Sequence, residues 1–271
     1  MKGRALGLLV AAGVVVGLAP VGGRAPALAP AQGPAPGAAV LIFQDEFDGP
    51  ALDAQVWDAC SAAPTSRCAN NHLAEYREGN VSVANGVLTL QARQEDDGAY
   101  ASGGISSGGF AFAYGYVEAR IKVPAGQGLW PAFWTLPADG SWPPEIDIVE
   151  ILGHRPNVAE LHYHYRGGGA PSGLDRASGK AWTGPDFSAG WHTFGVDWQP
   201  GSLVWYVDGV ERWRFTGAAV TAAPQRLLLN LAVGGRWPGP PNASTPFPRD
   251  FLVDYVRVWD QLSKNLPLTG I

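Results

Sequence analysis

Three carboxylic acids stand close together in the β-branched segment at residues 142–151, at Glu145, Asp147 and Glu150. Like charges at this spacing repel one another and cost stability, so a structural role explains them poorly. Retaining glycoside hydrolysis uses such a group, because it needs an ionised carboxylate as nucleophile and a protonated carboxylic acid as proton donor, about 5–5.5 Å apart. A third acid between them can hydrogen-bond the nucleophile and keep the two titrations apart. The alternative is a solvated edge strand that carries acids on its exposed face.

The chemistry requires the three acids to share one face of a strand. In a regular strand Glu145 and Asp147 share a face, while Glu150 points the other way. One extra residue, a β-bulge, would return Glu150 to the face of the other two, and bulges are common next to active sites. The apolar side chains below the sheet would then be Ile146, Ile148 and Ile151.

Tryptophans accompany the acids. Trp130, Trp134 and Trp142 precede Glu145 closely, and exposed edge strands are rarely so aromatic. The chain has 11 tryptophans in all, more than a core of this size requires. Indole faces suit flat partners such as sugar rings, with a tryptophan-rich core as the alternative.

Strand patterns surround this segment. Residues 116–123 alternate strictly between apolar and polar, and residues 191–198, 203–207 and 252–259 are also predicted strands. Asn85-Gly86 and Asp208-Gly209 are strong signals for hairpin turns. Residue 40 onward shows no long helical periodicity. The pattern predicts an all-β fold, an antiparallel two-sheet sandwich or jelly roll.

Composition limits the classes of protein. Hydrophobic residues make up 46% of the 271 residues, which allows a sizeable core. The chain has 36 glycines and 23 prolines, typical of many turns. With 19 basic and 24 acidic residues the net charge is −5, so no basic surface for nucleic acid is expected.

The N-terminal region is typical of export. Lys2 and Arg4 precede an apolar run over residues 5–19, followed by small residues. Because a membrane span needs about 20 apolar residues, we expect a signal peptide over 1–29, with an uncleaved anchor as the alternative. Residues 30–39 are predicted to be a Pro/Ala-rich linker, 40–261 the catalytic domain and 262–271 a tail. The expected product is a secreted monomer, extracellular or periplasmic, with no membrane contact in its mature form.

The two cysteines fit an oxidising compartment. Cys60 and Cys68 lie in a loop rich in Ser, Ala and Pro, and we expect them to form a disulfide there. A metal site is a poor alternative, since two thiols at this spacing lack enough nearby partners.

The whole pattern resembles glycoside hydrolase family 16. The six residues Glu145-Ile-Asp-Ile-Val-Glu150 look like the family signature in its bulged form, which is typical of bacterial laminarinase-like endo-β-1,3-glucanases rather than lichenase-like members. The resemblance covers nearly all of residues 42–260. Other similar segments are residues 45–48, 114–122, 126–134, 187–209, 227–239 and 252–258.

The resemblance implies a role for each acid. Glu145 would be the nucleophile, Glu150 the general acid/base, and Asp147 the residue that orients and tunes Glu145. The implied fold is a jelly roll whose concave face forms an open cleft for a β-1,3-glucan, with no cofactor in catalysis. Two alternatives remain: the same machinery on a mixed-linkage glucan or a galactan, and a glucan-binding module without catalysis. Such modules typically lose the glutamates, which this chain retains.

The resemblance also implies residues that bind substrate or metal. Each candidate for the cleft has a plainer alternative: core packing for the tryptophans, ordinary surface for Asn71 and His164, and a structural ion pair for Arg120. The cleft candidates are Trp130, Trp134, Trp237, Asn71, His164 and Arg120. A structural calcium ion on the convex face would be held by the Asp254 side chain and the backbone carbonyls of Glu46 and Gly86, and would act on stability.

Overall fold

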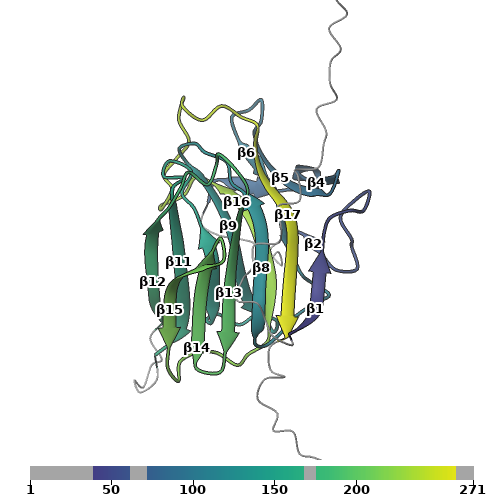
Figure 1. The fold of residues 1–271 in the computed structure, drawn as a ribbon. Coiled ribbons are helices and arrows are strands. Elements are labelled where there is room, and N and C mark those ends of the chain that lie inside the picture. The colour runs from purple at the N-terminus through teal and green to yellow at the C-terminus, as the bar shows by residue number, and fades with distance from the viewer. Residues whose placement is uncertain (1–38, 62–71, 168–174, 261–271) are drawn as a thin grey trace, which may run out of the picture.

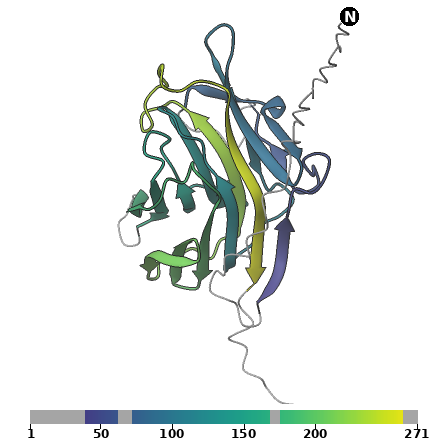
Figure 2. The same cartoon turned by 45° about the horizontal axis from the view of Figure 1, so that its top comes forward.

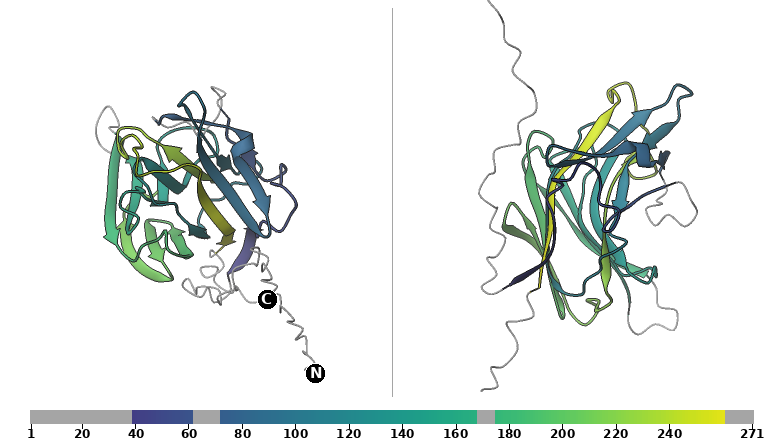
Figure 3. Two further views of the ribbon diagram at one scale, coloured as in Figure 1. Left: turned by 90° about the horizontal axis from the view of Figure 1, so that it is seen from above. Right: turned by 90° about the vertical axis from the view of Figure 1, so that its right-hand side faces the viewer.

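Two β-sheets lie face to face in the protein. The computed structural model describes residues 39–61, 72–167 and 175–260. The right-hand view of Figure 3 shows the two layers from the side, and Figure 1 shows the strands that form them. The described residues contain one short 3₁₀ helix, η1 (Glu78–Asn80), and no α-helix. The predicted all-β jelly roll is confirmed.

The larger sheet has ten strands, and all its pairings are antiparallel except that of β3 with β6. Its long strand β17 pairs with β8 along one edge, and with β5 and β1 at the two ends of the other. Figure 2 shows β1 (purple) beside β17 (yellow). The sheet runs in the order β15 (Val210–Thr216), β14 (Ser202–Val207), β13 (His192–Gln199), β8 (Gly115–Lys122), β17 (Arg249–Asp260), β5 (Val87–Gln94), β6 (Tyr100–Ser102) and β3 (Ala74–Tyr76), with β1 (Val40–Asp45) and β4 (Val81–Ala84) beside β17 and β5.

The smaller sheet has seven antiparallel strands and carries the acid-rich segment near its middle. Its order is β12 (Asp175–Thr183), β11 (Val158–Arg166), β10 (Glu145–Glu150), β9 (Leu129–Pro137), β16 (Gln225–Val233), β7 (Gly104–Ser106) and β2 (Asp58–Ala59).

Both predicted hairpin turns are confirmed. Asn85-Gly86 joins β4 to β5, and Asp208-Gly209 joins β14 to β15. All four residues have positive φ, between 50° and 73°, as a type I′ turn requires. The strongly twisted turn fits the right-handed twist of the strands, which is why these two dipeptides are reliable signals.

The core fills the space between the sheets. Val117, Ala119 and Ile121 of β8 point into it, as their alternation predicts, and are at most 1% exposed. A second, smaller group of buried apolar residues includes Trp134 and Leu228, which pair across β9 and β16, together with Cys60 and Tyr76. Because Trp134 also pairs with Asp147, this group lies on the face of the seven-stranded sheet that carries the acids.

Two of the polar side chains on the opposite face of β8, Glu118 and Arg120, are also buried. Glu118 is 2% exposed and accepts hydrogen bonds from the hydroxyls of Tyr116 and Tyr255, each at 2.7 Å. Arg120 is 8% exposed and donates to Asp254 Oδ2 at 2.7 Å. The outer face of the ten-stranded sheet is therefore covered by its own aromatic and charged side chains.

The expectation that Arg120 binds substrate is wrong. Its strand belongs to the ten-stranded sheet, whereas the three acids lie on the seven-stranded one. Its side chain is occupied by the ion pair with Asp254 and lies 5.3 Å from the ring centre of Trp191. The structural ion pair, which the sequence left open as the alternative, is the role that the structure supports.

Several expectations concern residues outside the described part of the chain. These are the signal peptide, nearly all of the linker, the C-terminal tail, Asn71 and Cys68. Cys60 is 3% exposed, and its pairing with Cys68 stays a prediction. Within the described residues, no helix has the length and apolar character needed to cross a bilayer.

Gly195 provides a test of the packing on the outer face of the ten-stranded sheet. A Cβ there would lie 2.5 Å from the Tyr116 hydroxyl oxygen and 2.9 Å from the Val117 carbonyl oxygen, and Tyr116 is buried. We therefore expect Gly195→Ala to lower the free energy of unfolding by about 1–3 kcal/mol, measured by urea denaturation. Gly79→Ala is the control, because a Cβ at Gly79 meets nothing within 4 Å. Equal stability of the two variants would contradict this account.

Candidate active site

The predicted bulge is present in β10. Against β9, Asp147 pairs with Trp134 and Val149 with Phe133, so β10 advances by two residues where β9 advances by one. The pairing with β11 is also irregular, between Asp147 and Glu150. The extra residue returns Glu150 to the face of Asp147, and the three predicted apolar residues, Ile146, Ile148 and Ile151, are each fully buried.

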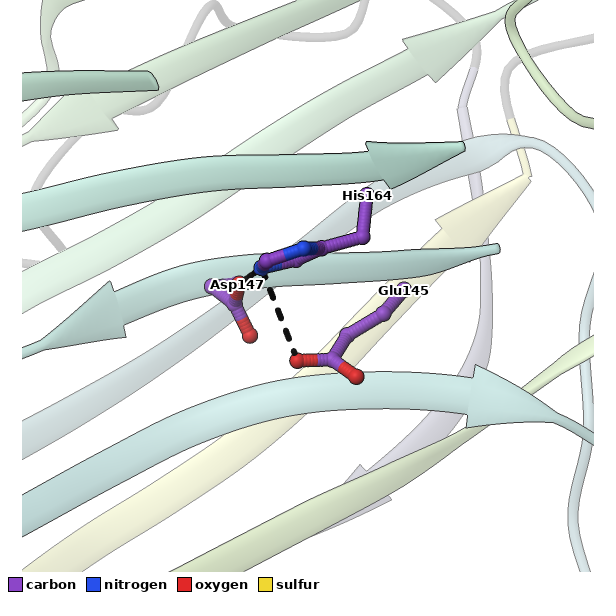
Figure 4. Close-up of side chains that lie close together, drawn as sticks. All are labelled: Glu145, Asp147 and His164. Carbon is purple, nitrogen blue, oxygen red and sulfur yellow. Dashed lines mark ion pairs between the residues drawn. The ribbon is translucent and has the colours of Figure 1, made fainter. Parts of the chain in front are cut away.

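Strand β11 places two histidines opposite the acids. His164 pairs with Glu145, and His162 pairs with Asp147. Residues that face each other across an antiparallel pair lie close enough for their side chains to interact. Figure 4 shows His164 reaching over to Asp147 and Glu145, with dashed lines at the contacts.

Glu145 is held by a tryptophan and is largely removed from water. The Trp142 indole donates to Oε2 at 2.6 Å, and His164 Nε2 lies 3.9 Å from Oε1. Burial raises the pKa of Glu145 to about 7, against the opposing effect of hydrogen bonds from Trp142 and Asp147. Glu145 therefore holds its proton more tightly than a free glutamic acid.

Asp147 is the most buried of the three acids, at 1% exposure. Its Oδ2 lies 3.2 Å from His164 Nε2. Burial raises its pKa well above the usual range, and the charges of Glu145 and Glu150 add to the rise. Coupled acids titrate as a unit, and the proton of such a pair stays on the less hydrated member. Asp147 therefore keeps its proton and donates it in a hydrogen bond to Glu145, which is the first of the two acids to ionise.

Glu150 is oriented through both of its oxygens. The Trp130 indole donates to Oε1 at 2.9 Å, and His162 Nδ1 lies 3.0 Å from Oε2. Behind His162 stands Glu160, with Oε2 at 4.0 Å from His162 Nε2. Glu160 also forms an ion pair with Arg155 at 3.1 Å, so the polar contacts of His162 extend away from the acid cluster to Arg155.

The pKa values of the two histidines are shifted in opposite directions. Burial lowers the pKa of His164. Burial also disfavours the charged form of His162, but the hydrogen bond and charge of Glu150 outweigh it, so the pKa of His162 is raised. Near neutral pH His164 is therefore neutral beside the buried Asp147, and His162 takes up a proton more readily beside Glu150.

The structure brings together most of the other predicted site residues. Trp237 is 39% exposed and packs edge-on against Trp130, with ring centres 5.3 Å apart, next to Glu150. His164 lies at the acids, as described. Trp134 is on the correct face but is 5% exposed and donates to Asn230 Oδ1 at 2.6 Å, so it is a packing residue beneath the site.

Sequence reasoning missed His162 and gave no role to Trp142. The alternation of Glu160, His162 and His164 on β11 indicates one polar face and would have added His162 to the prediction. Trp142 precedes β10, and no strand pattern indicates that its indole turns back to Glu145.

Two overlapping groups on this face have the side chains to ligate a cation: Glu145, Asp147 and His164, and Asp147, Glu150 and His162. In each group the ligand atoms lie within 4.8 Å of one another. Acids and imidazoles that share protons also lie this close together, so the short distances do not by themselves indicate a bound metal ion.

The family can be identified from the match of residues 69–257 to the model of glycosyl hydrolases family 16. The chain belongs to this family. The family 16 match contains the bulged strand, its acids and the two histidines.

Curated relatives and solved structures agree. Two endo-1,3-1,4-beta-glycanases of Rhizobium meliloti, ExsH and EglC, are 36% and 37% identical over 187 residues, which are 66% of this chain and 39% of each relative. A glucan endo-1,3-beta-glucosidase of Cryptopygus antarcticus is 34% identical over 260 residues, covering 82% of this chain and 93% of the relative. The endo-beta-1,3-glucanase of Pyrococcus furiosus superposes with a TM-score of 0.69 at 37% identity, covering 82% and 94% of the two chains.

The buried proton on Asp147 gives a pH-dependent prediction for this family 16 chain. A carboxyl whose pKa is raised in the folded state binds its proton there after the unfolded chain has lost it, so stability falls as pH rises above about 4. Asp147→Asn removes this loss and keeps an N–H donor for Glu145. We expect the melting temperature of the variant to overtake that of the parent as pH rises from about 4 to about 8.

Differential scanning calorimetry of both proteins between about pH 4 and pH 8 measures this difference. Loss of catalytic rate should accompany the gain in stability, because an amide cannot adjust its proton to the charge on Glu145. A stability difference that does not change with pH would contradict the assignment of the proton to Asp147.

Proposed function

We propose that the chain is an endo-acting β-1,3-glucanase that cleaves laminarin-type glucans with retention of configuration. The observation that carries the proposal is the bulge, which places Glu145 and Glu150 on one face of β10 with Asp147 buried between them. A retaining glycosidase needs this pair of carboxyl groups on one side of the scissile bond. The names of the relatives support β-glucan as the substrate class.

In the first half of the reaction, ionised Glu145 attacks the anomeric carbon while Glu150 gives its proton to the leaving oxygen. The indole N–H of Trp142 and the hydroxyl of protonated Asp147 hold the Glu145 carboxylate in place. The result is a covalent glycosyl-enzyme. Removing either donor would misalign the nucleophile.

In the second half, Glu150 takes a proton from water, and the resulting nucleophile breaks the glycosyl-enzyme bond. Trp130 and His162 hold the two oxygens of Glu150 through both steps. Trp237 beside Trp130 offers an exposed aromatic face for a sugar ring close to the cleaved bond.

A second candidate substrate is mixed-linkage glucan. Two curated relatives are named endo-1,3-1,4-beta-glycanases, and this chain spans only 39% of their length, so their names do not decide the linkage for it. A galactan is the remaining enzymatic alternative. A binding module without catalysis is opposed by the presence and orientation of both glutamates.

Reducing-sugar release from laminarin, lichenan and agarose tests the proposal. We expect the fastest release from laminarin. Glu145→Gln keeps the shape of the side chain but removes the attacking charge, so activity should fall by at least about 10³-fold with the fold retained, as judged by circular dichroism. A folded Glu145→Gln protein with near-parental turnover would refute the nucleophile, and preference for lichenan or agarose would refute the linkage.

Glu150→Ala tests the acid/base role separately. Turnover of natural glucans should fall severely, because their leaving alcohol needs a proton. An aryl β-glucoside with a good leaving group should still form the glycosyl-enzyme, and added azide should then restore turnover and give a β-glycosyl azide, detectable by NMR. Without such rescue, and with near-parental activity, Glu150 would have no acid/base role.

We also propose a structural calcium ion at the edge where β1, β5 and β17 meet. Strand register brings Glu46, Gly86 and Asp254 to this edge. The position of a Cβ on Gly86 would lie 3.9 Å from the Glu46 carbonyl oxygen and 3.2 Å from Asp48 Oδ1, so oxygen atoms converge there. Oxygen-only ligands fit Ca²⁺, and Asp48 is a further candidate ligand that the sequence did not indicate.

Calcium binding predicts a shift in stability. EDTA should lower the melting temperature and CaCl₂ restore it, because an ion bound only to the folded state stabilises it. Asp48→Asn should weaken the response and leave the Arg120–Asp254 ion pair in place. A melting temperature that is the same in EDTA and in CaCl₂ would refute the site.

Export is the remaining part of the proposal. A leader with positive charge and an apolar run supports secretion, and an oxidising compartment supports the disulfide between Cys60 and Cys68. Mass spectrometry of the secreted protein under non-reducing conditions tests both the cleaved leader and the bond.

A further inference from the structure

The buried Trp205 connects the two sheets at the catalytic strand. It lies on β14 of the ten-stranded sheet and has no solvent exposure. Its side chain reaches from one sheet to the other, and its indole N–H donates to the backbone carbonyl of Asp147 on β10 at 2.8 Å. Trp213 on β15 pairs with Trp205 and packs against its indole with ring centres 4.3 Å apart and ring planes tilted by 35°. The donor is therefore held on its own side of the core.

The accepting carbonyl has a special position. Asp147 is the last residue before the register becomes irregular in the pairings of β10 with both β9 and β11. At a bulge the ladder of hydrogen bonds is locally disrupted, and a buried carbonyl there needs a donor from elsewhere. The Trp205 N–H is such a donor, and it acts on the backbone of the residue that separates the two catalytic glutamates.

We propose that Trp205 is a positioning residue that fixes the bulge, and through it the spacing between Glu145 and Glu150. The inference rests on the proposed function, since the spacing matters only if these glutamates act on one bond. Trp205 touches no substrate, because it lies on the core side of β10. Its hydrogen bond to the catalytic strand is made to the backbone of Asp147.

This role predicts a defect in the rate and not in substrate binding. The side chains that meet the glucan stay on the outer face of the seven-stranded sheet, so KM should change little. A small misplacement of reacting groups lowers the rate strongly, so kcat should fall by about 10- to 100-fold. The two limbs of the pH–rate profile should also move, because the coupling between the acids depends on their separation.

The sharpest variant replaces Trp205 with β-(3-benzothienyl)alanine, which has the shape of tryptophan but carries sulfur in place of the N–H group. Trp198 is the matched control, because it is also fully buried and donates its indole N–H to a backbone carbonyl, that of Thr221, at 2.9 Å. Thr221 lies outside β10. Both substitutions should lower the melting temperature, but only the one at position 205 should lower kcat and shift the pH–rate profile.

Two further variants separate the donor from the ring. 5-Fluorotryptophan at position 205 keeps the N–H and should keep kcat and the pH–rate profile. Trp205→Phe, which removes the donor and part of the ring, should reproduce the kinetic defect, whereas Trp198→Phe should not. If the benzothienyl variant at 205 matches the parent in kcat and pH–rate profile, or if the variant at 198 shows the same kinetic defect, the inference is wrong.

Hydrogen exchange distinguishes this inference from the proposed function. The backbone amides of Val149 and Glu150 should exchange faster in the variant at 205 than in the parent or the variant at 198. A parent that cleaves none of the three glucans would refute the proposed function while leaving this measurement intact. Unchanged exchange at these amides in an active parent would refute the role of Trp205.

Discussion

One extra residue in β10 determines which side chains the seven-stranded sheet presents together. Without it, Glu150 would point into the core, and Val149 and Ile151 would lie on the outer face with Glu145 and Asp147. With it, the same strand keeps a continuous apolar face toward the core and three acids on the opposite face. The shifted register of β10 is held by its pairing with β9 and β11 and by the isoleucines that pack into the core.

The cost of placing three acids together is reduced by burial and by proton sharing. Asp147 is too buried to ionise beside Glu145, so the cluster carries less charge at neutral pH than its composition suggests. His164 stays neutral next to it, while His162 gains positive character beside Glu150. The site is thus divided into a neutral half at Asp147 and a charged half at Glu150, which suits a reaction that needs two different carboxyl groups.

Strand alternation and turn chemistry are local, and they were predicted from the sequence: the two hairpins, the inward face of β8 and the apolar face of β10. The bulge was predicted because the chemistry requires Glu150 beside Glu145. Arg120 was assigned wrongly because alternation shows that a residue points outward without showing from which sheet. The contact of Trp142 with Glu145 depends on the path of the segment before β10, and that of Trp205 with Asp147 on packing between distant strands; neither has a periodic signal.

Besides its titratable partner, each glutamate accepts a hydrogen bond from an indole, Trp142 for Glu145 and Trp130 for Glu150. An indole N–H neither gains nor loses a proton in the range where carboxylic acids and imidazoles titrate. A change in pH can therefore alter the charge of the acid cluster while each glutamate keeps its hydrogen bond to an indole. When Glu150 alternates between acid and base in each catalytic cycle, the Trp130 N–H keeps its carboxyl group oriented without itself gaining or losing a proton.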